Sequence, residues 1–421
     1  MLSLNGLKKK LYFFVARYFM FWANISLKRW NPRIFALTGS VGKTTLLNLT
    51  EVQLGNKAHY SHNANSVFGI AFDILGLTGI TGSKLKWFYL FFAAPIKSFF
   101  FTHTESIFVV EIDGERPYET EMLASWLKPE LTFWVSFGRS HAVQFDKQVK
   151  EGKFKNVDEA ILHEFAFLPK YTTQAIIYNA NDANIEKAIK DLNIKKYPIT
   201  KNALKHYEVW PNKTEINVNN TTFTFNEPVP SEIYVQLAMI EILAKYLNEK
   251  PVTNFSGFIQ PPGRSNFYKG IKSTNLIDSS YNAHLISMRS IIDLYKKMQT
   301  STKWVVIGDI VDQGQTEAEQ HSELGEILNN ANFDRYIFVG RRTQAYTYSK
   351  LDPKKAVTFL HPKDALKYLK NEIKGNETIL FKGSQYLEGI IADLLEDKSN
   401  IKNLPRQDEA AKKRRAKWGL K

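Results

Sequence analysis

The sequence predicts an α/β protein made of two units, each built on a mostly parallel sheet. Three observations lead to this fold class. Short apolar runs alternate with helix-length segments from about residue 34 to residue 395. A segment rich in proline and glycine, residues 251–263, divides the alternation into a longer and a shorter series. Strands that are separated by helices form parallel sheets with crossover connections, so each series predicts a sheet of its own.

In the first unit, buried strands are expected at residues 34–37, 106–111, 131–136 and 175–179. Short antiparallel strands around asparagine and threonine turns are expected between residues 202 and 226, and a helix over residues 231–247 closes the unit. In the second unit the expected strands are residues 275–278, 304–309, 336–340 and 378–382. Ligands of parallel sheets bind beyond the carboxyl ends of the strands, which is where Glu111 and Asn179 fall.

The composition is that of a globular protein with two or three domains: 421 residues, 44% hydrophobic and 23% charged. The absence of cysteine excludes disulfides, thiolate metal sites and cysteine nucleophiles, and is typical of a reducing cytoplasm. The net charge of +14 indicates an anionic partner, either nucleic acid, a membrane surface or a phosphorylated substrate. No nucleic-acid-binding motif accompanies the charge, so a nucleic-acid partner is not expected.

Two aromatic segments with basic flanks stand out near the N-terminus, residues 8–23 and residues 87–101. The first is interrupted by Arg17 and is shorter than the roughly 20 apolar residues of a spanning helix, and no small-residue cleavage site follows it. Two interpretations stay open. The segments lie in a membrane interface, or they pack on each other or on the core. The positive charge is concentrated at the two ends, in residues 8–10 and residues 412–421, and two interpretations stay open for it: these cations bind an anionic partner, or they belong to solvated ends.

Residues 38–45 form the most informative motif, because a glycine-containing turn joins an apolar strand to the start of a helix. Backbone N–H groups of such a turn face a phosphate, Lys43 adds a point charge, and the Thr44 hydroxyl suits Mg²⁺. The usual spacing of this motif has a first glycine where this chain has Leu37. The predicted nucleotide-binding residues are Gly39, Ser40, Val41, Gly42, Lys43, Thr44 and Thr45.

Further motifs follow the loop in a fixed order: residues 61–69, Glu111, residues 136–141, Gly263-Arg264, residues 277–283 and residues 382–384. Together they resemble the Mur ligase family over roughly residues 34–395. The likeness is greatest to the member that adds D-alanyl-D-alanine to a peptidoglycan precursor. The resemblance implies a P-loop ATPase-type central domain followed by a smaller Rossmann-like domain. The expected boundaries are a hydrophobic, basic helix at 1–33, the central domain at 34–256, the C-terminal domain at 257–398 and a basic tail at 399–421.

The resemblance also implies an ATP-dependent amide ligase that works through an acyl phosphate, requires ATP and Mg²⁺, and acts in the cytoplasm, with peripheral membrane contact an open option. By resemblance, Lys43 and His141 are catalytic, and Thr44, Glu111 and His141 hold metal. The nucleotide also contacts Arg264, Asp278, Tyr281 and Asn282 of the second unit. The substrates contact Asn63, Asn65, Lys382 and Ser384.

The chain departs from the family pattern in three respects. Leu162 stands where the family has a carbamylated lysine that binds the second Mg²⁺; either His163 or Glu164 substitutes, or that metal is held differently. Ser136 and Ser279 replace an asparagine and an aspartate. The loop begins within 40 residues of Met1, so the family's UDP-binding domain is expected to be absent. Two alternatives therefore remain: a ligase for another, membrane-associated carboxylate, and a nucleotide-binding homologue without catalytic activity.

Overall fold

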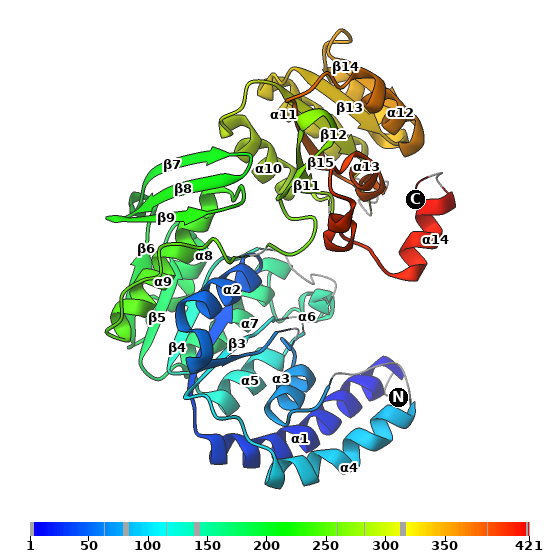
Figure 1. Ribbon diagram of the computed structural model, residues 1–421. Coiled ribbons are helices and arrows are strands. Elements are labelled where there is room, and N and C mark those ends of the chain that lie inside the picture. The colour runs from blue at the N-terminus through cyan, green and yellow to red at the C-terminus, as the bar shows by residue number, and fades with distance from the viewer. Residues whose placement is uncertain are drawn as a thin grey trace. The chain divides into compact units, whose positions relative to one another are not determined.

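The computed structural model of the protein describes residues 4–420 apart from 63, 79–83, 115, 139–143, 259, 282, 312–316, 385 and 418–419. The chain folds as two compact units (Figure 1). Unit 1 comprises Met1–Ala203 and Tyr234–Val252, and unit 2 comprises Leu204–Ile233 and Thr253–Lys421. Residues 204–233, which the sequence assigned to the central domain, therefore group with the second unit.

Unit 1 is built on a six-stranded, wholly parallel sheet with the strand order β2-β3-β1-β4-β5-β6. Its strands are β1 (Arg33–Thr38), β2 (Ala58–Tyr60), β3 (Ile107–Glu111), β4 (Leu131–Trp134), β5 (Ala175–Asn179) and β6 (Lys195–Ile199). Its helices are α1 (Leu4–Trp30), α2 (Lys43–Leu54), α3 (Val67–Ile74), α4 (Lys84–Phe100), α5 (Glu119–Leu127), α6 (Asp146–Lys150), α7 (Val157–Tyr171), α8 (Ala183–Ile189) and α9 (Tyr234–Tyr246). The predicted parallel sheet of the first unit is confirmed.

Unit 2 contains a second six-stranded sheet in the order β10-β11-β15-β12-β13-β14, in which only β10 is antiparallel to its neighbour. Its strands are β10 (Asn266–Lys269), β11 (Asn275–Ser279), β12 (Lys303–Gly308), β13 (Arg335–Val339), β14 (Ala356–Phe359) and β15 (Thr378–Lys382). Its helices are α10 (Leu285–Lys297), α11 (Glu317–Ala331), α12 (Pro362–Glu372), α13 (Leu387–Leu394) and α14 (Glu409–Lys417). The predicted antiparallel strands form a three-stranded sheet of β7 (Leu204–Trp210), β8 (Lys213–Val218) and β9 (Thr221–Phe225).

The four strands that the sequence did not predict, β2, β6, β10 and β14, are the edge strands of the two six-stranded sheets. Edge strands are covered on fewer sides, and only one of the five residues of β6 is buried. Such strands lack the continuous apolar run that marks β3, in which all five residues are buried.

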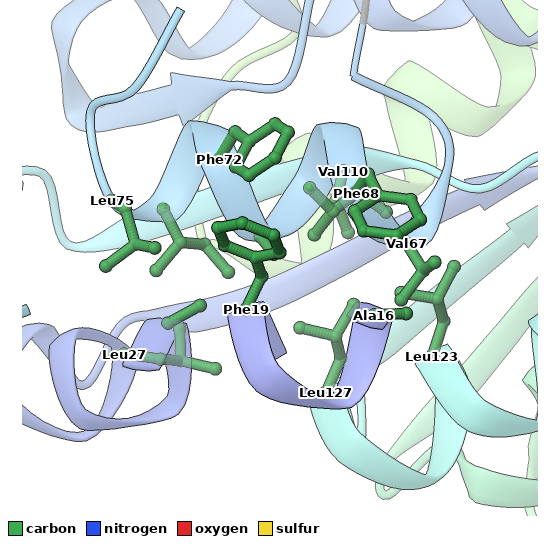
Figure 2. Close-up of a cluster of buried hydrophobic side chains, with 14 of the residues drawn as sticks. Ala16, Phe19, Leu27, Val67, Phe68, Phe72, Leu75, Val110, Leu123 and Leu127 are labelled. Carbon is green, nitrogen blue, oxygen red and sulfur yellow. The ribbon is translucent and has the colours of Figure 1, made fainter. Parts of the chain in front are cut away.

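Helix α1 is tied into unit 1 along one face, on which Ala16, Phe19, Ala23 and Leu27 are buried. This face packs against α3, α4 and α5, with Phe19 beside Phe72 in the centre (Figure 2). Between the helices, the Tyr18 hydroxyl donates to the Phe91 carbonyl of α4 at 2.7 Å. The two aromatic segments therefore pack on each other and on the core. This packing was one of the two interpretations of these segments that the sequence left open. None of the helices in the described part of the chain combines the length and hydropathy needed to cross a bilayer.

The basic C-terminal segment is folded onto unit 2 rather than wholly solvated. Leu404 and Leu420 belong to the apolar core of that unit. The carboxylate of Glu388 is fully buried and lies 3.2 Å from an Arg406 nitrogen and 3.6 Å from an Arg415 nitrogen. Burial raises the pKa of Glu388, and the two guanidinium groups oppose that rise. The interpretation of this segment as a solvated end is wrong at these residues.

Candidate functional site

The glycine-containing turn connects β1 to α2 and has the backbone conformation that a phosphate cradle requires. Gly39 and Gly42 have φ angles of +139° and +87°, in the left-handed region that favours glycine. Helix α2 begins at Lys43, so its free N–H groups point into the turn. Leu37, which replaces the first glycine of the usual spacing, is a fully buried residue of β1. The turn therefore starts after that position.

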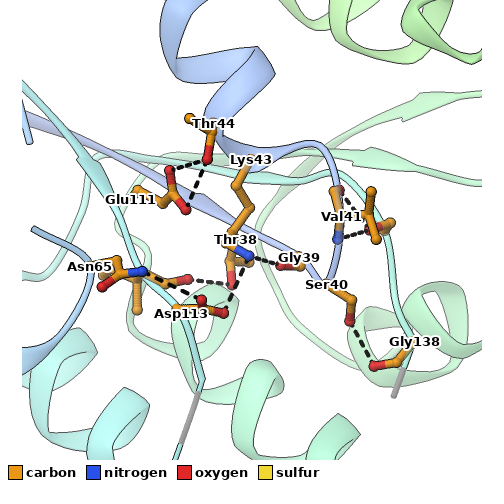
Figure 3. Close-up of polar contacts among 12 residues, drawn as sticks. Thr38, Gly39, Ser40, Val41, Lys43, Thr44, Asn65, Glu111, Asp113 and Gly138 are labelled. Carbon is orange, nitrogen blue, oxygen red and sulfur yellow. Dashed lines mark hydrogen bonds and ion pairs between the residues drawn. The ribbon is translucent and has the colours of Figure 1, made fainter. Parts of the chain in front are cut away.

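Ser136, one of the departures from the family pattern, holds the turn in place. Its hydroxyl accepts a hydrogen bond from the Val41 N–H at 2.9 Å and donates one to the Val41 carbonyl at 2.8 Å (Figure 3). Its carbonyl accepts from the Ser40 N–H at 3.2 Å, and the Ser40 hydroxyl donates to the Gly138 carbonyl at 2.7 Å. A serine at this position can thus position the turn through its own hydroxyl.

Lys43 lies almost buried beneath the turn. Its ammonium group donates to the Gly39 carbonyl and lies 3.2 Å from an Asp113 carboxylate oxygen (Figure 3). Asn65 approaches the other Asp113 oxygen at 3.4 Å. Sequence reasoning missed Asp113. The available signal was a second carboxylate two residues after Glu111, beyond the same strand end.

Thr44 and Glu111 bring two oxygen ligands together at the carboxyl edge of the sheet. The Thr44 hydroxyl lies 3.1 Å from one Glu111 carboxylate oxygen and 3.4 Å from the other. Neighbouring ligands of an octahedral Mg²⁺, bound at about 2.0–2.1 Å, are about 2.9 Å apart. The observed spacing therefore fits a shared hard cation. Burial raises the pKa of Glu111, and the nearby Lys43 charge opposes that rise.

The two candidates for replacing the family's lysine are engaged elsewhere. The Glu164 carboxylate accepts hydrogen bonds from the N–H groups of Tyr118 at 2.9 Å and Thr120 at 2.8 Å, at the start of α5. Burial raises the pKa of Glu164 to about 7. The His163 ring packs between Phe154 and Phe167, with centroid distances of 5.1 and 4.9 Å. Of the three options from the sequence, a differently held second metal agrees best with these contacts.

Unit 1 contains a separate group of potential metal ligands, His59, His103 and Glu105. The two histidines of this group pack against each other and against an aromatic ring. The two imidazole rings lie with their centroids 4.0 Å apart and their planes tilted by 38°, and the Trp30 ring centroid is 4.4 Å from that of His103. Each imidazole Nε2 lies 3.0 Å from an oxygen of Asp73. These contacts account for the histidines without an ion.

In unit 2, the predicted residues gather at the carboxyl ends of β11 and β15, which are parallel neighbours. Asp278 is fully buried, accepts from the Ser280 N–H at 2.9 Å, and has a pKa raised by burial to about 6. Lys382 is the last residue of β15, and burial lowers its pKa to about 8 while Asp278 opposes the shift. Ser384 follows and donates its N–H to the Asp309 carbonyl at 3.0 Å.

Tyr281 is half exposed beside these residues and lies between two arginines. The guanidinium carbons of Arg264 and Arg406 are 5.7 and 5.9 Å from its ring centroid. Arg406 also donates to the Ser280 carbonyl at 3.1 Å and to the Tyr281 carbonyl. Sequence reasoning missed Arg406, because it lies in the segment interpreted as a solvated end. An aromatic ring flanked by guanidinium groups is a surface that suits an anionic, aromatic ligand such as a nucleotide.

Three predicted site residues, Asn63, His141 and Asn282, lie outside the described residues. Of the others, the structure brings residues 39–45, Asn65 and Glu111 together in unit 1. It brings Arg264, Asp278, Tyr281, Lys382 and Ser384 to one end of the sheet in unit 2.

One family model matches part of the chain, and curated relatives match most of it. Residues 263–385 match the family model described as Mur ligase, glutamate ligase domain. This region is a Mur ligase C-terminal domain. Beyond this Mur-type domain, the chain is similar over most of its length to curated proteins named UDP-N-acetylmuramoyl-tripeptide–D-alanyl-D-alanine ligase. The relative from Buchnera aphidicola is 23% identical over 392 residues, covering 88% of this chain and 78% of the relative. The relative from Bacillus subtilis is 23% identical over 390 residues, covering 89% of this chain and 78% of the relative.

Solved structures show the same Mur ligase fold. MurF from Acinetobacter baumannii superposes with a TM-score of 0.67 at 18% identity, covering 91% of this chain and 80% of that one. The MurF ligase from Thermotoga maritima in complex with ADP superposes with a TM-score of 0.65 at 19% identity, covering 95% of this chain and 84% of that one. The predicted fold class, a P-loop-type central domain with a mostly parallel sheet followed by a smaller Rossmann-like α/β domain, is therefore confirmed.

Proposed function

We propose that the chain is an ATP-dependent amide ligase that joins D-alanyl-D-alanine to a peptidoglycan precursor peptide. The observation that carries the proposal is the arrangement of Lys43, Thr44 and Glu111 around a glycine turn, in a chain whose second unit is a Mur ligase domain. The names of the curated relatives support the choice of substrates. We place the reaction in the cytoplasm, where ATP and nucleotide-linked precursors are available.

The reaction divides into two substitutions. An oxygen of the precursor carboxylate attacks the γ-phosphorus of ATP, the bond to the bridging oxygen breaks, and ADP leaves. The amine of D-alanyl-D-alanine then attacks the acyl carbon, phosphate leaves, and the amine loses a proton as the amide forms. Both steps bring anions together, so the site must neutralise phosphate charge and exclude water.

The chain's own residues supply these functions. The turn N–H groups and the Lys43 ammonium bind the β- and γ-phosphate oxygens, and Lys43 exchanges Asp113 and the Gly39 carbonyl for them. Thr44 and Glu111 would hold a Mg²⁺, which lowers the charge on the phosphates when bound. Asp113, two residues after Glu111 and paired with Lys43 in this structure, would be a candidate ligand for a second cation in place of the family's lysine. Within unit 2, Arg264, Tyr281 and Arg406 form a surface that would suit a nucleotide.

An assay of ADP release tests this function. The full chain is incubated with ATP, Mg²⁺ and UDP-N-acetylmuramoyl-tripeptide, with and without D-alanyl-D-alanine. We expect ADP release that depends on the dipeptide and an amide product of the corresponding mass. ADP binding without dipeptide-dependent turnover would contradict the proposal and favour the nucleotide-binding homologue without catalytic activity. Turnover only with a lipid-linked or otherwise different carboxylate would favour the alternative ligase.

A further inference from the structure

The outward face of α4 is as apolar as its buried face. Leu90, Ala93 and Ala94 point into the core. On the opposite side, seven large apolar residues recur at helical spacing and are 55–84% exposed: Leu85, Phe88, Tyr89, Phe92, Ile96, Phe99 and Phe100. A helix that is apolar all round is normally buried on all sides or inserted in lipid. Among the described residues of unit 1, neither the sheet nor another helix covers this face of α4.

Helix α1 extends the same apolar surface. Leu11, Phe14 and Phe21 are 60–73% exposed and lie outside the buried face of α1 that Ala16, Phe19, Ala23 and Leu27 form. The rows on the two helices meet at Trp22, whose ring centroid is 5.0 Å from that of Phe21 and 6.3 Å from that of Phe99. Helices α1 and α4 run side by side at the edge of unit 1 (Figure 1). We call the ten exposed side chains of the two rows the α1–α4 face.

The α1–α4 face is far larger than an ordinary surface patch. Ten such side chains, each about two-thirds exposed, present on the order of 1,000 Å² of apolar area. The largest patch on a typical soluble monomer is about 300–600 Å² and is often functional. The size of the face indicates that something covers it.

The charge of the two helices indicates what covers it. Helix α1 contains Lys8, Lys9, Lys10, Arg17, Lys28 and Arg29, helix α4 contains Lys84, Lys86 and Lys97, and neither helix contains an aspartate or glutamate. Exposed Arg17 lies between Phe14 and Phe21 along α1, and exposed Lys28 lies two turns after Phe21. Aromatic side chains with cations beside them suit the headgroup region of an anionic bilayer. A second copy of the chain would bring the same cations against one another.

We propose that the α1–α4 face binds the surface of an anionic lipid bilayer, with its aromatic and aliphatic side chains in the headgroup–acyl boundary and its cations on lipid phosphates. The inference stands apart from the proposed function, because it uses none of the phosphate-site residues. It would hold unit 1 at a membrane surface.

Co-sedimentation of the full chain with vesicles tests the proposal. We expect binding to vesicles of phosphatidylcholine mixed with phosphatidylglycerol, weaker binding to phosphatidylcholine alone, and loss of affinity as salt is raised. The triple variant Phe88→Ser, Phe92→Ser, Phe100→Ser should bind on the order of a hundredfold more weakly, because three rings no longer enter the lipid. The matched control Ile286→Ser, Leu360→Ser replaces exposed apolar residues of unit 2 and should bind like the parent chain.

Two further measurements separate the outcomes. Arg17→Gln with Lys28→Gln should weaken binding to the anionic vesicles and leave binding to phosphatidylcholine unchanged. The triple variant should keep the urea midpoint of the parent, because the replaced rings lie mostly in solvent. The proposal is overturned if the parent chain does not bind anionic vesicles or if the triple variant binds as well as the parent. It is also overturned if sedimentation velocity shows a dimer that the triple variant abolishes while vesicle binding is absent.

Discussion

Replacing Lys43 by methionine removes the ammonium group of the phosphate site and keeps most of the apolar stem. In the parent chain this ammonium lies 3.2 Å from Asp113, and the two side chains are only 7% and 14% exposed. The Asp113 carboxylate keeps its contact with Asn65 in the variant but loses its cation. We therefore expect two separate effects, one on stability and one on nucleotide binding.

The burial of the pair sets the size of the effect on stability. Breaking a fully buried ion pair costs about 3–5 kcal/mol, whereas an exposed pair contributes about 0–1 kcal/mol. For this nearly buried pair we expect Lys43→Met to lower the free energy of unfolding by about 2 kcal/mol. Adding Asp113→Asn removes the isolated carboxylate, so the double variant should recover most of that loss. ATP affinity should fall about ten- to a hundredfold in both variants, because each has lost a charged hydrogen bond to phosphate.

Urea denaturation followed by tryptophan fluorescence measures the first effect, and calorimetric titration with ATP and Mg²⁺ measures the second. Lys57→Met is the matched control, since Lys57 is 59% exposed and pairs with Glu249 on the surface; both quantities should stay unchanged. A single variant as stable as the parent would refute the role given to burial of the pair. Unchanged ATP affinity in the double variant would refute the role of Lys43 as a phosphate ligand.

Three further predictions concern Glu111, Gly39 and Arg415. Burial raises the pKa of Glu111, so the Glu111 carboxyl group keeps its proton to a higher pH than the carboxyl group of a free glutamate. Because the protonated carboxyl group binds Mg²⁺ poorly, the affinity for Mg²⁺ should fall as the pH drops through that raised pKa. In a calorimetric titration, Glu111→Gln should abolish this pH dependence. Gly39→Ala places a Cβ 2.9 Å from the Ser136 nitrogen in a left-handed turn. We therefore expect the free energy of unfolding, measured by urea denaturation, to fall by about 1–3 kcal/mol and ATP to bind more weakly. A stability and an ATP affinity equal to those of the parent chain would contradict the turn geometry. Arg415→Met leaves the buried Glu388 carboxylate with Arg406 as its one remaining cation partner among the described residues, and should destabilise unit 2 by about 3 kcal/mol, whereas a solvated tail would give no change in the urea midpoint.

The phosphate turn could be predicted from the sequence because all its signals lie within about ten residues. An apolar strand, two glycines and a Lys-Thr helix start specify the backbone locally, and the structure places each of them as expected. The partners that hold the turn could not be predicted. Ser136 and Asp113 lie far along the chain from Val41 and Lys43, and they reach the turn only because β3 and β4 flank β1 in the sheet.

The edge strands and the C-terminal segment show the same limit. Strands β2, β6, β10 and β14 lack continuous apolar runs, since an edge position leaves part of each strand exposed. The segment after residue 399 is basic in composition, which favours a solvated end. Arg406 and Arg415 of this segment instead lie against the Glu388 carboxylate. The burial of Glu388 depends on packing between α13 and the sheet of unit 2.

The sequence by itself determined the α/β class, the positions of the central strands along the chain and the position of the phosphate turn, because hydrophobic periodicity and turn chemistry are local properties of the chain. Tertiary structure alone decided that Asp113 faces Lys43, that Glu164 is engaged at the start of α5, and that Arg406 reaches Tyr281. It also decided that α4 is buried on one apolar face and exposed on the other. Such contacts depend on which strands and helices become neighbours, and local residue patterns do not encode those pairings.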